Sequence, residues 1–247
     1  MQKPPFFIIG SVRSGTTFLR NVLRQHPNLV CPEETHFFRW SDAFGTPVSL
    51  TVLQNNLTLK KHRGLDNVTE EQFKEILQKS TSRADLQRRY MGLYMKQNQL
   101  HDKRWFDKTP QNVYGSTIIA NDFPGAKFIH IVRNPLNVVS SLRIGHVVKI
   151  ESIVGACNVW NEAITVLNTL KKAYPKRVYE VKYEDFTTNF SPELEKLLNF
   201  VDEDFNSEYF SNIMTTTKEH EHENLFNQQE LETIKRLCKQ WINHYGY

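Results

Sequence analysis

The sequence predicts an α/β protein in which helices flank a central parallel sheet. Short apolar runs typical of buried strands alternate along the chain with longer segments of helical periodicity. No stretch rich in glycine, proline or serine divides the 247 residues, so we expect a single domain over residues 1–247. The first apolar run ends in a turn with two glycines that leads directly into a helix, and we therefore expect a ligand beyond the carboxyl ends of the strands.

The first predicted elements are a strand, a turn and a helix. Residues 6–10 are apolar and predict a buried strand. Residues 16–25 predict a helix, because their apolar residues recur with the helical period; these are Phe18, Leu19, Val22 and Leu23. Residues 29–31 predict a second short strand, whereas residues 41–67 have no pattern that favours either element.

The middle of the chain opens with a capping signal. Thr69, followed three residues later by Gln72, predicts the start of a helix that runs to about residue 79. A further helix is expected over residues 83–98. A strand over residues 104–107 and a helix over residues 111–122 continue the alternation.

The second half of the chain repeats this pattern. Residues 127–132 predict a buried strand. Pro135 then suits the first turn of a helix that continues through Ser141. An N–H in the first turn has no partner within the helix, so proline, which has no N–H, loses no hydrogen bond there. The remaining predicted elements are a long helix over residues 152–173, a strand over 177–181, and helices near 191–201 and 229–244.

Composition and charge narrow the functional classes. Hydrophobic residues make up 39% of the chain, which supports a packed core. The net charge of +4 is compatible with an anionic ligand but too small to predict nucleic-acid binding. The three cysteines are odd in number and far apart, so we expect reduced structural thiols and neither a disulfide framework nor a cysteine zinc site. Because we see no leader and no membrane-spanning run, we expect a cytoplasmic protein.

The turn after the first strand resembles a phosphate-binding loop. In such a turn, backbone N–H groups and the N-terminus of the following helix point to one place and bind phosphate or sulfate. The run from Gly10 to Thr17 departs from the pattern G-x-x-x-x-G-K-[ST] at the lysine, where Thr16 stands, and its cation is Arg13 instead. Since nucleotide triphosphatases use that lysine on the outer phosphates, we expect a phosphate ligand other than Mg-ATP.

A second anion site is predicted directly after residues 127–132. Arg133 stands at the end of this strand, where magnesium nucleotidases often carry an aspartate, and an arginine there binds an anion through its planar guanidinium. Ser141 follows eight residues later, about two turns into the next helix. Taken alone, Arg133 suits a surface ion pair and Ser141 an ordinary helix position. Together with the Arg13 loop, they predict a ligand with anionic groups at two separated places.

These segments resemble the sulfotransferases that use 3′-phosphoadenosine-5′-phosphosulfate (PAPS). Residues 12–17 are similar to the family's 5′-phosphosulfate loop, and residues 131–141 to its 3′-phosphate element. The run Glu34-Thr35-His36-Phe37-Phe38 resembles the E-x-H-F-F run of heparan sulfate sulfotransferases. Glu33-Glu34-Thr35 resembles the E-E-T run of tyrosylprotein sulfotransferases. Residues 107–110 resemble the K-[ST]-P segment, and residues 181–186 the tyrosine-bearing strand end near the cofactor. The resemblance implies a P-loop-like sulfotransferase fold.

The resemblance also implies roles for the matching residues. Glu34 matches the proposed general base, and His36 is expected to orient Glu34, to bind the acceptor or to act as the base itself. Lys108 and Arg13 are expected at the leaving bridge oxygen and the sulfuryl oxygens, so that no metal is required. The expected cofactor-binding residues are Arg13, Ser14, Gly15, Thr16, Thr17, Phe18, Arg133, Ser141, Tyr183 and Lys218. Lys218 lies in a charged segment that suits a solvated loop better than a metal site.

Each of these assignments has a structural alternative. Glu34 also suits a helix cap, His36 a buried hydrogen-bonded histidine, Lys108 a solvated surface position and Tyr183 the core.

The leading hypothesis is therefore in-line transfer of a sulfuryl group from PAPS to an acceptor hydroxyl, which leaves adenosine 3′,5′-bisphosphate (PAP). The similarity to the E-x-H-F-F run favours a carbohydrate or small-molecule hydroxyl as acceptor. A lipid hydroxyl and peptide tyrosine stay open, although His36 stands where the tyrosylprotein branch has arginine. The alternatives are a P-loop nucleotide kinase or nucleotidase, which Thr16 and Arg133 disfavour, and a non-catalytic nucleotide-binding protein, which Glu34 and Lys108 disfavour. We expect no nucleic-acid partner and no membrane span, and the sequence does not indicate the oligomeric state.

Overall fold

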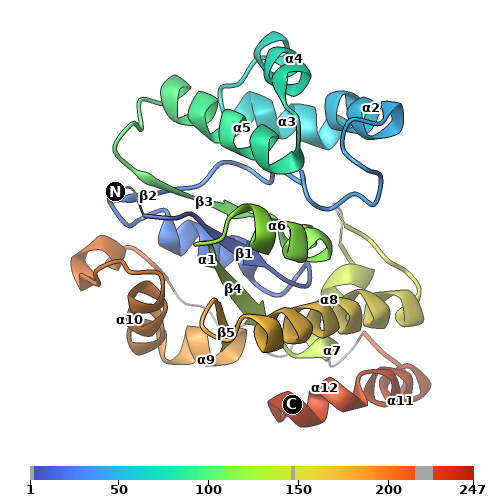
Figure 1. The fold of residues 1–247 in the computed structure, drawn as a ribbon. Coiled ribbons are helices and arrows are strands. Elements are labelled where there is room, and N and C mark those ends of the chain that lie inside the picture. Colours follow the sequence, from blue (N-terminus) through green and yellow to red (C-terminus); the bar gives the residue numbers. More distant parts are fainter. Residues whose placement is uncertain (1–2, 146–147, 215–224) are drawn as a thin grey trace. The chain divides into compact units, whose positions relative to one another are not determined.

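The computed structural model describes residues 3–145, 148–214 and 225–247 (Figure 1). Its strands are β1 (Phe6–Ile9), β2 (Leu29–Val30), β3 (Arg104–Lys108), β4 (Lys127–Val132) and β5 (Val178–Lys182). They form one sheet in the order β2-β3-β1-β4-β5. β3 pairs in parallel with both β1 and β2, with Phe106 opposite Phe6 and Arg104 opposite Leu29. The predicted α/β class with a central parallel sheet flanked by helices is confirmed.

The chain divides into two compact units. The first comprises Met1–Ile9 and Thr17–Phe128, and the second comprises Gly10–Thr16 and Ile129–Tyr247. The expectation of one domain over residues 1–247 stays a prediction. Among the described residues, no helix is long and apolar enough to cross a lipid bilayer.

The helices between β1 and β4 belong to the first unit. They are α1 (Thr16–Leu23, whose first residue belongs to the second unit), α2 (Pro47–Asn55), α3 (Leu57–Leu65), α4 (Glu70–Lys79), α5 (Arg83–Gln97) and α6 (Ser116–Asp122), with the 3₁₀ turn η1 (Pro110–Gly115) before α6. The capping box of Thr69 and Gln72 forms as predicted at the start of α4. Aromatic rings fill the core beside β1 and β3, where Phe6 stacks on Phe106 with ring centroids 4.7 Å apart.

Residues 41–67, which showed no clear pattern, contain α2 and α3. Thr46 caps α2, and Asn56 caps α3 by accepting hydrogen bonds from the first-turn N–H groups of that helix. Arg63 on α3 is 2% exposed and donates to both carboxylate oxygens of Glu70, at 2.7 Å each, and to the Leu53 carbonyl at 3.1 Å. A buried charge is stable only when it is paired in this way. Because these partners lie on α2 and α4, this arginine joins α4 to the two helices that local periodicity does not reveal. The three helices are labelled in Figure 1.

Two predicted helices are in fact interrupted. The helix predicted over residues 111–122 is a 3₁₀ turn followed by α6, and Gly115 packs so closely on Phe38 that an added Cβ would lie 2.3 Å from the Phe38 carbonyl oxygen. The helix predicted over residues 229–244 is α11 (Gln228–Leu237) followed by α12 (Lys239–Tyr245). The break falls at Cys238, which is completely buried in the core of the second unit. Tertiary packing fixes both interruptions.

The second unit is built on a long central helix. Its other helices are α7 (Pro135–Arg143), α9 (Tyr183–Thr188), α10 (Phe190–Phe200), α11 and α12, with the 3₁₀ turn η2 (Ser207–Phe210). The central helix, α8 (Ile153–Ala173), packs against α7 and α11 (Figure 1). Trp160 on α8 is completely buried in a core that also contains Cys157 and Cys238. All three cysteines of the chain are buried and form no disulfide, as expected from the sequence.

Candidate functional site

A carboxylate, an ammonium group and an imidazole meet in the first unit, beyond the carboxyl end of β3. Lys108 is the last residue of β3, and its side chain is only 2% exposed. Its ammonium group donates a hydrogen bond to Thr17 Oγ1 at 3.2 Å and forms an ion pair with Glu34. The Glu34 side chain is 24% exposed, so solvent reaches this carboxylate but scarcely the lysine.

His36 lies on the other side of the Glu34 carboxylate. Its Nε2 is 3.3 Å from Glu34 Oε2, and its φ of 55° is a left-handed backbone conformation that few non-glycine residues adopt. The His36 ring stacks on the ring of His62, with centroids 5.9 Å apart, and His62 Nδ1 is 2.9 Å from the Glu34 carbonyl oxygen. Glu34 is thus held through both its side chain and its backbone.

The surroundings shift the pKa values of both Glu34 and His36. Burial alone would raise the pKa of Glu34, but the hydrogen bond with His36 and the charge of Lys108 outweigh it and lower this pKa to about 2. Burial lowers the pKa of His36 below its usual value, against the opposing effect of Glu34. At neutral pH Glu34 is therefore a carboxylate and His36 a neutral imidazole.

A buried network fixes the segment that carries Glu34. Asp107 is completely buried and accepts hydrogen bonds from Thr35 Oγ1 at 2.7 Å and from Asn112 Nδ2 at 3.1 Å. The Thr35 N–H donates to Thr109 Oγ1 at 3.0 Å, and the Phe38 N–H donates to Asn112 Oδ1 at 3.1 Å. Burial raises the pKa of Asp107 to about 6, although these hydrogen bonds act in the opposite direction. Sequence reasoning gave Asp107 no role, but a carboxylate within a buried strand is itself a signal of such a network.

The second unit holds a separate group, formed by the loop before α1. Arg13 and Gly15 have φ angles of 69° and 93°, which give the loop its tight curvature. Arg13 Nε donates a hydrogen bond to Ser141 Oγ at 2.8 Å, so two predicted site residues 128 positions apart are in contact. Ser14 Oγ is buried and makes no hydrogen bond to any of the described residues.

Arg133 and Tyr183 adjoin this loop in the same unit. The Arg133 guanidinium lies 4.4 Å from the centroid of the Tyr183 ring. A Cβ added at Gly15 would lie 2.3 Å from the same ring, so only glycine fits there. Tyr183 begins α9 rather than ending a strand, because the chain turns into a helix directly after Lys182. This group thus combines two arginines with a buried hydroxyl beside a tightly curved loop, which are donors that an anion accepts from.

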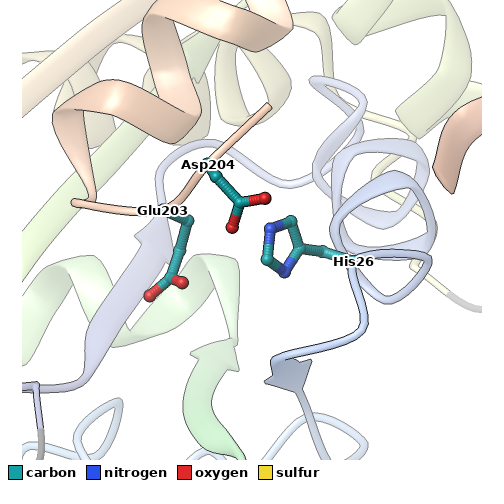
Figure 2. Close-up of side chains that lie close together, drawn as sticks. All are labelled: His26, Glu203 and Asp204. Atoms are coloured by element: carbon teal, nitrogen blue, oxygen red, sulfur yellow. The ribbon is translucent and has the colours of Figure 1, made fainter. Parts of the chain in front are cut away.

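The remaining predicted residues lie as follows. Thr16 is buried and Thr17 is exposed in the first turn of α1, where Phe18 is half-buried. Lys218 lies outside the described residues. Figure 2 shows His26, which follows α1, together with Glu203 and Asp204, which follow α10. His26 belongs to the first unit and the two carboxylates to the second, so neither unit by itself holds a group of three metal-ligating side chains among its described residues.

The comparisons with known proteins identify the family. Residues 4–207 match the family described as "Sulfotransferase family". The chain belongs to the sulfotransferase family. An uncharacterized protein of Aquifex aeolicus is 28% identical to this sulfotransferase over 207 residues, which are 80% of this chain. The chain spans only 25% of that relative's length.

Solved structures share the fold of this sulfotransferase. The sulfotransferase domain of the Synechococcus PCC 7002 olefin synthase matches with a TM-score of 0.67 and 23% identity, over 98% of this chain and 88% of that one. Mouse sulfotransferase SULT7A1, solved as a complex with PAP, matches with a TM-score of 0.54 and 14% identity, over 98% of this chain and 84% of that one. At these identities the similarity shows the fold alone.

Proposed function

We propose that this sulfotransferase transfers a sulfuryl group from PAPS to an acceptor hydroxyl, with Glu34 as general base. The observation that carries the proposal is the contact of Glu34 with Lys108 and His36, since it joins a proton acceptor to a cation able to stabilise developing negative charge. The PAP-bound mouse relative supports the choice of nucleotide.

The second unit offers residues suited to the nucleotide. The backbone N–H groups of Ser14 to Thr16 and the N-terminus of α1 are the proposed partners of the 5′-phosphate. Ser14 Oγ, buried without a hydrogen-bond partner among the described residues, is a further donor for it. Arg133 and Ser141 are the proposed partners of the 3′-phosphate. PAPS supplies an activated sulfuryl group whose leaving group is a phosphate.

Lys108 is the proposed cation beside the base. Thr17 follows the loop directly in the chain, and Lys108 already donates to its hydroxyl. We propose that Lys108 directs its charge to the sulfuryl oxygens during transfer, which raises the pKa of Glu34 and strengthens it as a base. Glu34 takes the proton of the acceptor hydroxyl, and His36 keeps the carboxylate oriented through Nε2.

The acceptor class remains the one favoured by the sequence, a carbohydrate or small-molecule hydroxyl. A P-loop kinase or nucleotidase is disfavoured, because Thr16 replaces the phosphate-binding lysine. The cytoplasmic location stays a prediction.

The direct test is transfer of radiolabelled sulfate. Purified protein is incubated with labelled PAPS and a panel of sugars, aliphatic alcohols, phenols and a tyrosyl peptide, and PAP binding is measured separately by calorimetry. We expect labelled product from at least one acceptor, loss of labelling with Lys108→Met, and normal labelling with Lys96→Met, which changes an exposed lysine of α5. Absence of both labelling and PAP binding, or ATP hydrolysis with magnesium in their place, would overturn the proposal.

A further inference from the structure

Glu184 holds the backbone next to Arg133 from a position outside the predicted site. Its Oε1 accepts a hydrogen bond from the Asn134 N–H at 2.9 Å, and its Oε2 accepts one from the Tyr247 hydroxyl at 2.9 Å. We propose that Glu184, held in turn by Tyr247, is a positioning residue that aims Arg133 at the 3′-phosphate of the nucleotide. The inference rests on the proposed function, because it requires that Arg133 binds this phosphate.

The contacts fix one peptide group at both of its polar atoms. The Asn134 N–H and the Arg133 carbonyl belong to the same peptide, and the carbonyl accepts a hydrogen bond from Trp160 Nε1 at 3.0 Å. Trp160 is completely buried, so this partner is rigid. With both atoms held, rotation of this peptide plane is restrained, and with it the backbone from which the Arg133 side chain leaves.

The first turn of α9 also contacts the side chain of Arg133. Tyr183, whose ring lies 4.4 Å from the Arg133 guanidinium, is the residue directly before Glu184. The same helical turn therefore fixes the backbone of Arg133 through Glu184 and packs against its charged end through Tyr183. A guanidinium that is already oriented loses less entropy when it binds a phosphate.

Tyr247 keeps Glu184 in place across the relevant pH range. Burial, followed by the charge of Glu184, raises the pKa of Tyr247 well above its usual value, so its hydroxyl stays protonated and donates. Lys182 Nζ lies 4.8 Å from the centroid of the Tyr247 ring and donates to the Tyr245 carbonyl at 3.1 Å, which joins this end of α12 to β5.

The chain contains a matched control for Tyr247. The Tyr245 hydroxyl donates to Glu180 Oε2 at 2.9 Å, the same kind of bond at the same length. Glu180 is also held by His130 at 2.9 Å and by Lys171 at 3.2 Å, and neither contact involves the peptide between residues 133 and 134. Tyr245→Phe and Tyr247→Phe thus remove equivalent bonds, of which only the second leads to Arg133.

The experiment compares two nucleotides in calorimetric titrations of the purified full chain. PAP carries the 3′-phosphate and adenosine 5′-monophosphate lacks it, so the ratio of their affinities reports the 3′-phosphate contact alone. We expect Tyr247→Phe to lower this ratio about fivefold and Glu184→Ala about tenfold or more, the scale of coupling between residues of one hydrogen-bond network. We expect Tyr245→Phe to leave the ratio unchanged. We expect Glu184→Gln to keep most of the wild-type ratio, because its amide oxygen still accepts a hydrogen bond from the Asn134 N–H.

The outcomes separate the two proposals. If the wild-type chain binds PAP no better than adenosine 5′-monophosphate, the proposed 3′-phosphate site itself is wrong. If Arg133→Ala lowers the ratio but Tyr247→Phe and Glu184→Ala do not, only the positioning role is refuted. Equal weakening of both nucleotides by the Tyr247 and Glu184 variants refutes it as well, because a loss of general stability would act on both ligands alike.

Discussion

Replacement of Glu34 by glutamine tests the proposed chemistry most directly. Glutamine keeps the shape of the side chain but cannot take a proton from the acceptor, and it removes the negative charge beside Lys108. Removal of a general base reduces a rate by about 10²–10⁴, so we expect a loss of this size in kcat for sulfuryl transfer. We expect the affinity for PAP to stay within about twofold, because the proposed phosphate-binding residues lie on other segments.

The same substitution has a predictable effect on stability. A fall of the Glu34 pKa from 4.5 to about 2 corresponds to about 3 kcal/mol of stabilisation of the folded state by the charged carboxylate. Since the pKa is lowered on folding, this stability is present above pH 4.5 and is lost as the pH falls towards about 2. Glu34→Gln should therefore lower the free energy of unfolding at pH 7, with a smaller difference from wild type at about pH 3.

Glu33→Gln is the control for both measurements. The Glu33 side chain is 21% exposed, close to the 24% of Glu34, and it pairs with Arg20 at 2.7 Å instead of with Lys108. Both variants lose a partly buried ion pair, but only Glu34→Gln should lose turnover. Rates are measured with labelled PAPS, and stability by urea denaturation. Undiminished turnover by Glu34→Gln, or an equal loss in Glu33→Gln, would remove Glu34 from the mechanism.

Three further predictions concern the second unit and the support of Glu34. Arg133→Ala should weaken PAP binding by about 2–3 kcal/mol, the size of a lost charge-assisted contact, and unchanged calorimetric affinity would exclude Arg133 from the site. Gly15→Ala should destabilise the protein by about 1–3 kcal/mol or more in urea denaturation. Alanine disfavours the φ of 93°, and its Cβ would collide with the Tyr183 ring. A variant as stable as wild type would contradict this packing. Folding raises the pKa of Asp107 from 3.8 to about 6, so its contribution to stability is present below pH 3.8 and is lost as the pH rises through about 6. The Asp107→Asn variant should lack this loss when the free energy of unfolding is measured from about pH 4 to pH 7. If wild type and variant showed the same pH dependence, Asp107 would not titrate in this range.

Elements with strong local signals could be predicted from the sequence. β4 has the predicted bounds, and α4 begins at the predicted capping box, because a continuous apolar run and a capping box depend on residues that are close in the chain. The turn between β1 and α1 was predictable for the same reason, since a strand, a glycine turn and a helix are consecutive there.

Elements that depend on distant partners could not be predicted in this way. Residues 41–67 fold into α2 and α3, which the buried Arg63 joins to α4. The interruption at Cys238 arises because this residue is buried in the core around α8. In both cases the contact that decides the structure is made with another helix, so no pattern within the segment itself predicts that structure.

The sequence by itself determined the fold class and named the chemical groups of the proposed site, because a strand–glycine turn–helix run and a glutamate two residues before a histidine are local patterns. Only the tertiary structure decided which of these groups meet. It placed Arg13 against Ser141 and Lys108 against Glu34, and it brought Glu184 and Trp160 to one peptide beside Arg133. Hydrogen bonds and ion pairs act over a few ångströms in space, whereas these partners lie tens of residues apart in the chain.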